Sequence, residues 1–339
     1  FLCFLFSFFE NSKITHLKNK KAIALLFAAN TVSGVSQGIS LIAIPWFIAN
    51  QLGRPGLYGL LYLIVTILTL FWGPYAGTLV DKYDRKKVMI SIQTVGLLCV
   101  FSIAALGWYW QNTTLWMAAA IMIITKLIYN IHYPNLYAFA QEITEKSRYG
   151  TISSAIEVQG QTTFILSGAI AAFLMEGEFF SLNFEAWKMH EIFMLDAATY
   201  GLGFVLISMI KYESLVDRNF YSQATFLQRL NEGFSYLKGN PLILLFGTVA
   251  GFVFATVLVC SFFTMPIFIE KFLGGTQSHY GFTEASFALG SMLSGFLILY
   301  LFPKNKITIG IILLSLIAGV MYFFIGMNQD FILLYIAYA

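Results

Sequence analysis

Long apolar stretches, each able to cross a lipid bilayer, constrain this chain more than any other feature. A helix needs about 20 mostly apolar residues to cover the hydrocarbon core of a membrane. The stretches that reach this length run over residues 22–49, 57–80, 88–110, 113–138, 150–175, 190–210, 241–269, 281–302 and 307–326, and a further one begins near Phe331. We therefore predict an all-α membrane protein with about nine spans and the start of a tenth.

The composition excludes several other classes of protein. Apolar residues make up 58% of the 339 residues and charged residues only 11%, which is more apolar surface than one soluble core of this size can bury. The net charge of +3 is small and the basic residues form no single patch, so no nucleic-acid partner is expected. The three cysteines, Cys3, Cys99 and Cys260, are dispersed and predict neither a disulfide framework nor a metal site.

Lysine and arginine residues predict the orientation of the spans. If the segment before the first span is cytoplasmic, sixteen of the 20 basic residues lie in inner loops. The outer loops then hold only Arg54, Lys188 and Lys271, and Lys126 lies inside a span. Inner loops of membrane proteins carry such an excess of positive charge, so we expect a cytoplasmic N-terminus.

The longest inner loop divides the chain. Within it Phe226, Leu230, Phe234 and Leu237 recur at helical spacing, which predicts an amphipathic helix at the inner surface. We expect an N-terminal cytoplasmic extension (1–21), a six-helix bundle (22–211), a cytoplasmic connector (212–240) and an incomplete second bundle (241–339). Two six-helix halves would need about 70 further residues, so we expect the sequence to be truncated at its C-terminal end.

A charge-dense loop joins the second and third spans. It reads Gly77-Thr-Leu-Val-Asp81-Lys-Tyr-Asp84-Arg85-Lys86-Lys87. This order of glycine, acid and basic run resembles the loop signature of the major facilitator superfamily of secondary transporters. The resemblance implies a fold of two six-helix halves, the second of them truncated here, in a multi-pass protein of a bacterial plasma (inner) membrane.

Other stretches resemble one branch of that superfamily, the drug and siderophore exporters that include macrolide efflux and enterobactin-exporter-like proteins. They are residues 226–241 before the seventh span, Met194-Leu-Asp196-Ala-Ala-Thr-Tyr200 in the sixth, and 134–144 at the end of the fourth. The resemblance covers residues 22 to 326. In the fifth span, the expected antiporter motif appears only as Gly168-Ala-Ile-Ala-Ala, without its proline.

The resemblance gives the loop residues a role. It implies that Gly77 allows two helices to pack closely, and that Asp81, with Arg85, latches the outward-open state against the N-terminus of span eleven. Lys86 belongs to the same loop, and Asp84 replaces the usual glycine and adds a second acid beside Arg85. The alternative is a solvated loop that only orients the protein.

Ionisable residues inside spans are candidate functional groups, because burying them is costly unless they are paired or hydrated. Lys126 lies midway along span four, Glu157 in span five, Asp196 in the outer part of span six and Glu284 at the mouth of span eight. Lys126 and Glu157 could form a charge pair, although their depths differ by roughly 8 Å.

Residues at helical spacing, three, four or seven apart, also follow one face of three helices, and most of them are polar. The stripes are Lys126, Asn130, Tyr133 and Tyr137 in span four, Glu157, Gln161 and Gly168 in span five, and Asn30, Ser33, Gln37 and Ser40 in span one. They could line a hydrated substrate path. The alternative is that they hydrogen-bond between helices and hold the bundle together.

These features predict a proton-coupled exporter of small amphiphilic or hydrophobic molecules that works by alternating access. We expect a monomer whose partners are its substrate and the bilayer, with a proton gradient in place of any cofactor. The alternatives are a receptor or assembly factor that has lost transport, an integral-membrane enzyme and a channel. An enzyme would need converging His, Cys or Asp residues, but the four histidines are far apart in the sequence, so no catalytic residue or metal site is predicted.

Overall fold

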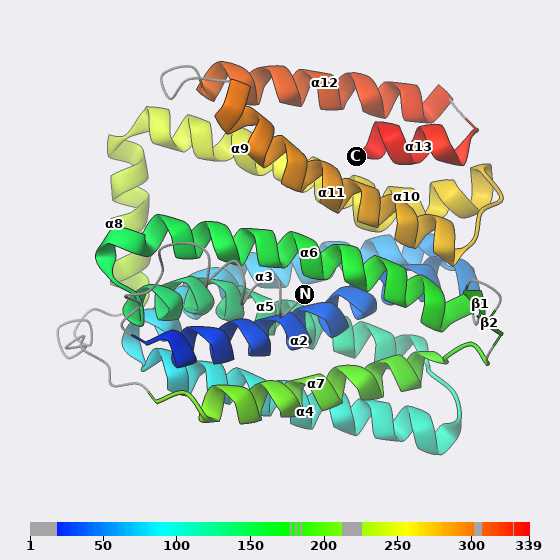
Figure 1. The fold of residues 1–339 in the computed structure, drawn as a ribbon, viewed down its shortest axis with the longest axis horizontal. Helices are drawn as coiled ribbons and strands as arrows, with labels where there is room; N and C mark the ends of the chain where they lie inside the picture. Colours follow the sequence, from blue (N-terminus) through cyan, green and yellow to red (C-terminus); the bar gives the residue numbers. More distant parts are fainter. Residues whose placement is uncertain are drawn as a thin grey trace. The chain divides into compact units, whose positions relative to one another are not determined.

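The computed structural model describes residues 19–176, 178–179, 182–183, 185–211, 226–301, 307–327 and 329–339 (Figure 1). Most of the predicted extension and residues 212–225 of the connector lie outside these ranges. The helices are α2 (Lys20–Trp46), α3 (Pro55–Lys82), α4 (Arg85–Trp110), α5 (Leu115–Glu142), α6 (Tyr149–Glu176), α7 (Met189–Ser208), α8 (Phe226–Gly239), α9 (Pro241–Val259), α10 (Met265–Ile267), α11 (Gln277–Leu301), α12 (Ile307–Met327) and α13 (Phe331–Tyr338).

Short irregular elements complete the described chain. Segments of π-helix are η1 (Phe47–Gln51), η4 (Cys260–Thr264) and η5 (Phe268–Phe272), and η2 (Lys146–Arg148) is a 3₁₀ turn. The strands β1 (Glu178–Phe179) and β2 (Leu182–Asn183) pair antiparallel, with Glu178 opposite Asn183. This hairpin of two-residue strands lies in the loop between α6 and α7, and the fold class is all-α as predicted.

The helices occur where the apolar stretches predicted them. Seven continuous helical stretches of the described chain are long and apolar enough to cross a membrane, the last of them Pro241–Phe272. In that stretch, Leu242 (80% exposed), Phe252 (76%) and Phe246 (68%) point away from the protein, as side chains do when their solvent is lipid. The count of nine spans stays a prediction, because α11 is not one of the seven and α12 enters only as the shorter apolar stretch Ile312–Met327.

The connector helix α8 is present at Phe226–Gly239 and ends before Pro241. Phe234 and Tyr236 on it are exposed, which suits contact with a membrane surface. Its position on the inner surface and the predicted domain boundaries stay predictions.

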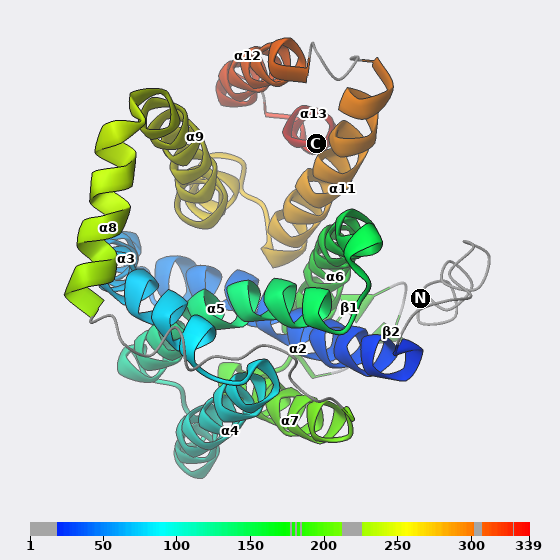
Figure 2. The same ribbon diagram turned by 90° about the vertical axis from the view of Figure 1, so that its left-hand side faces the viewer.

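The chain forms two compact units. Unit 1 contains the chain up to Ser33 together with Leu60–Ile156 and Phe193–Val257, and unit 2 contains Gly34–Gly59, Glu157–Ile192 and Leu258–Ala339. In unit 1, α4 lies beside α7 (Figures 1 and 2), and the ring of the buried Tyr200 packs where a Cβ on Gly96 would stand. The small residue therefore allows α4 and α7 to approach closely.

Small residues also bring helices together in unit 2. A Cβ added to Gly281 of α11 would lie 2.7 Å from the carbonyl oxygen of Gly168 in α6, and the two helices are neighbours in Figure 2. Ser167 beside Gly168 donates a hydrogen bond to the carbonyl of Val35 in α2, at 2.8 Å. Such contacts replace hydrophobic burial as the source of helix packing in a membrane.

Candidate functional site

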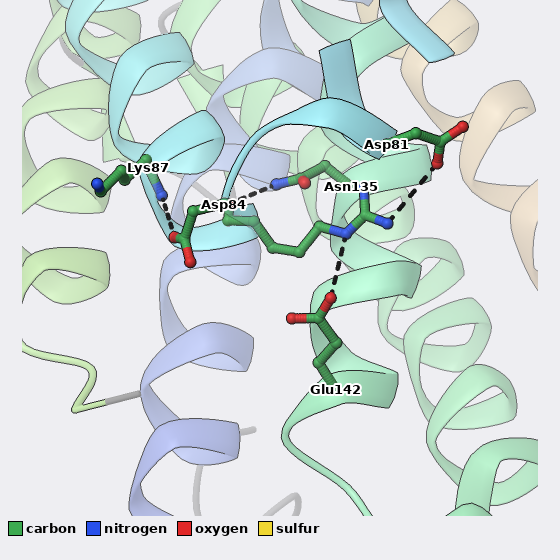
Figure 3. A network of polar contacts seen from close by, with 6 residues as sticks. Asp81, Asp84, Lys87, Asn135 and Glu142 are labelled. Carbon is green, nitrogen blue, oxygen red and sulfur yellow. Dashed lines mark hydrogen bonds and ion pairs between the residues drawn. The ribbon is translucent and has the colours of Figure 1, made fainter. Parts of the chain in front are cut away.

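The loop between α3 and α4 forms a polar cluster in unit 1 (Figure 3). Asp84 is the N-cap of α4, and its carboxylate accepts a hydrogen bond from the backbone N–H of Lys87 at 2.9 Å. An aspartate here accepts a hydrogen bond from an N–H that has no partner within the helix. Its negative charge is also stabilised by the positive end of the helix dipole. Asp84 therefore starts the third span, a role that its place before an apolar run could have predicted.

Arg85 lies between two acids. Its Nη2 is 3.7 Å from Asp81 Oδ1, and its Nε is 3.5 Å from Glu142 Oε1 at the end of α5. The side chains of Arg85 and Glu142 are 14% and 15% exposed, whereas Asp81 is 54% exposed. Both distances exceed a hydrogen bond. The guanidinium therefore links the ends of α3, α4 and α5 by electrostatic attraction. Its Nε and Nη1 donors are buried and stay without hydrogen-bond partners among the described residues.

The cluster contains two further residues, which the sequence had not indicated as site residues. Glu142 is the second acid of Arg85, and the fully buried Asn135 donates to the backbone carbonyl of Arg85 at 2.8 Å. The available signal for Glu142 was an acid at the end of span four that the charge pattern predicts to lie on the same side of the membrane as the basic loop.

Lys86 has a separate role. Its Nζ donates to the carbonyl of Ser208 at the end of α7, at 3.0 Å, where a cation is favoured by the negative end of the helix dipole. A Cβ on Gly77 would meet no described atom within 4 Å. The close helix packing expected at Gly77 is therefore not made within the described structure.

The predicted polar stripe on α5 makes its contacts largely along its own helix. The ammonium group of Lys126 lies 5.7 Å from the centre of the Tyr129 ring, and Asn130 donates to the carbonyl of Lys126 at 2.9 Å. Tyr133 packs against Tyr129, with ring centres 4.4 Å apart. Lys126, Asn130 and Tyr133 are half-buried, and the charge is held over an aromatic face.

The stripe on α2 bonds to neighbouring helices. Asn30 Oδ1 and His132 Nε2 of α5 are hydrogen-bonded at 2.8 Å, with both side chains buried. Ser33 accepts a hydrogen bond from Gln93 of α4 at 3.4 Å. Gln37 is also buried. For Asn30 and Ser33 these bonds favour the packing alternative, and they assign a partner to His132 that the sequence analysis had not given it.

The remaining predicted site residues are spread over both units. In unit 1 Asp196 is fully buried on α7. In unit 2 Glu157 is exposed and Gln161 half-buried on α6. Lys126 belongs to unit 1 and Glu157 to unit 2, so their charge pair stays a prediction. Among the residues that the structure describes, no three His, Cys, Asp or Glu side chains gather where they could hold a metal ion.

A groove of about 560 Å³ lies on α3, α4 and α5 in unit 1. Its lining is almost wholly apolar and includes Trp72, Tyr75 and Ile128, with Lys87 and Ser91 as polar members. Such a surface suits a molecule with a large apolar part and one polar group better than an ion.

Comparison with known proteins agrees with this architecture. The model of the Major Facilitator Superfamily matches residues 26–339. Macrolide efflux protein A of Streptococcus pyogenes is 24% identical over 276 residues, which are 80% of this chain and 65% of that protein. Macrolide efflux protein A of Enterococcus faecalis is 25% identical over 67% of each chain, and the MFS-type transporter YfiS of Bacillus subtilis is 22% identical over 82% of this chain and 63% of its own length.

The chain thus spans about two thirds of the length of these relatives. A solved structure with the same fold is that of a mutant of the nucleoside transporter NupG, with a TM-score of 0.65 and 16% identity. The match covers 94% of this chain and 78% of that one.

Proposed function

Because this chain belongs to the Major Facilitator Superfamily, a family of membrane transporters, we propose that it exports small amphiphilic or hydrophobic molecules in exchange for protons. Similarity to proteins named for macrolide efflux supports the direction and the substrate class. The apolar groove with Lys87 supports the same class. The protein acts as a monomer in the bacterial plasma membrane, with its N-terminus in the cytoplasm. It uses the proton gradient as its energy source and needs no cofactor.

The observation that carries this proposal is the position of Arg85 between Asp81 and Glu142. The two ion pairs, at 3.7 and 3.5 Å, tie together the ends of three helices. The pair with the half-exposed Asp81 contributes only about 0–1 kcal/mol, whereas the pair with Glu142 is largely shielded from water. The two pairs hold this loop in place within unit 1. The latch proposed for the loop is the attraction of Asp81, with Arg85, to the N-terminus of span eleven, which breaks when the carrier opens inward.

The polar residues of the spans are proposed to line the substrate and proton path. Lys126, Asn130 and Tyr133 contribute from α5, Gln37 from α2, Glu157 and Gln161 from α6 and Asp196 from α7. Asn30, which was also expected on this path, is assigned to helix packing because it bonds to His132. A charge inside the bilayer is tolerated only where it is hydrated or paired. Of these residues, Lys126 is therefore the one most strongly expected to line the hydrated path.

Transport by the purified protein in liposomes tests the proposal. With an imposed pH gradient, we expect the wild type to accumulate a radiolabelled macrolide, and Asp81→Asn, Lys126→Ala and Glu157→Gln each to reduce the initial rate at least about tenfold, or about 1.4 kcal/mol. Glu145→Gln, at an exposed acid beyond the end of α5, is the matched control. If all three variants transport like the wild type, the site assignment is wrong; if the wild type transports nothing, a receptor or assembly role is favoured.

A further inference from the structure

A buried carboxyl group in unit 2 lies outside the site described above. The sequence placed Glu284 at the mouth of a span, but α11 begins at Gln277, so Glu284 lies two turns inside the helix and is 0% exposed. The hydroxyl of Tyr338 donates to Glu284 Oε1 at 3.4 Å, and Oε2 is buried with no hydrogen-bond partner among the described residues. The helices that meet here, α11, α12 and α13, are neighbours in both ribbon views (Figures 1 and 2).

No positive charge compensates this group within the described structure. The titratable groups that interact electrostatically with Glu284 are the phenols of Tyr338 on α13 and Tyr322 on α12. Both phenols also interact with the thiol of Cys260 in η4. An ionised carboxylate with one long hydrogen bond and no cation is strongly disfavoured in an apolar interior. A proton on the carboxyl group removes that charge.

The hydroxyl network around Glu284 ends on an irregular part of the seventh span. Tyr338 is hydrogen-bonded to the hydroxyl of Ser261, and Tyr280 donates to the carbonyl of Ser261 at 3.2 Å. Ser261 belongs to the π-helical segment η4, and Pro266 follows without an N–H to stabilise the helix. Such π-helical segments bend more readily than regular helix and occur often at functional sites.

We propose that Glu284 carries the transported proton: the carboxyl group holds it while it is buried as seen here, and releases it to water when the π-helical segment η4 of the seventh span moves Ser261 and Tyr338 away. This assignment rests on the proposed proton-coupled transport. The ligand is a proton, bound to a carboxylate oxygen as the group is buried and lost as hydronium when the group is hydrated. No other reactant is needed.

Liposomes that contain the protein and an entrapped pH-sensitive dye test this assignment. Glu284→Gln has the shape of the protonated acid but cannot release a proton. In this variant we expect both the transport driven by the pH gradient and the accompanying proton flux to fall at least tenfold. Exchange of labelled for unlabelled macrolide at equal pH should stay within twofold of the wild type. Glu270→Gln changes an acid of the same unit that already pairs with Lys271, and it should leave both activities unchanged.

The possible outcomes separate the two proposals. A wild type that exchanges macrolide without moving protons removes the proposed coupling and the role of Glu284 with it. A coupled wild type matched by Glu284→Gln overturns the Glu284 assignment alone, as does loss of exchange in a folded Glu284→Gln. If Glu284→Gln does not fold, Tyr338→Phe decides: a shift in the pH dependence of driven transport supports the assignment, and an unchanged profile contradicts it.

Discussion

At the scale of single residues, polar side chains in this protein start helices, bridge them, or are buried with few partners. Asp84 shows the first role, the pair of Asn30 and His132 the second, and Glu284 the third. Each role depends on atoms from the surrounding backbone or from another helix. Residue type and depth alone could indicate that these residues matter, but not which role each has.

Replacing Asp84 separates its helix cap from its charge. We expect Asp84→Ala to lower the free energy of unfolding by about 1 kcal/mol, because the N–H of Lys87 loses its acceptor. Asp84→Asn keeps an acceptor oxygen and should cost at most a few tenths of a kcal/mol. Thermal unfolding in detergent measures both, and equal losses in the two variants would mean that the charge, rather than the cap, is what stabilises α4.

The ion pair of Arg85 and Glu142 can be tested by exchange of its charges. Arg85→Glu and Glu142→Arg should each destabilise the protein, and the double variant should regain on the order of 1 kcal/mol. Recovery should be incomplete, because the new carboxylate at position 85 would face Asp81. Glu145→Arg combined with Arg85→Glu is the control, and a similar recovery there would show that only net charge is involved.

At the scale of helices, glycines decide which pairs approach closely. Gly168 and Gly160 both lie in α6, but a Cβ on Gly168 meets the backbone of Gly281 at 2.7 Å, whereas a Cβ on Gly160 meets no described atom within 4 Å. The same substitution should therefore have opposite effects at the two positions.

Gly168→Ala and Gly160→Ala make this comparison directly. Gly160→Ala should stabilise the protein by about 0.5–1 kcal/mol, the ordinary preference of a helix for alanine over glycine. Gly168→Ala should destabilise it by about 1–3 kcal/mol, because α6 and α11 must move apart. The two melting temperatures in detergent give the signs, and a stabilised Gly168→Ala would contradict the close packing.

At the scale of the whole molecule, the distribution of basic residues predicts the orientation in the membrane. In a variant without Cys3, Cys99 and Cys260, we expect a cysteine in place of the exposed Asn112 to react with a membrane-impermeant maleimide in intact cells. A cysteine in place of the exposed Tyr83 should react only after permeabilisation. The reverse pattern would mean that the N-terminus is outside.

Hydropathy was sufficient to predict a helical membrane protein and the ranges of its helices, because the cost of placing a residue in lipid is a local property summed along the chain. The family resemblance came instead from the motif in the loop between the second and third spans. The loop signature likewise identified Asp81 and Arg85. The pairing of Arg85 with Glu142 and the partners of His132 and Glu284 were not predictable in this way, because they depend on which helix faces meet. Those faces are set by small residues such as Gly96, Gly168 and Gly281, whose close contacts appear only once the helices are packed.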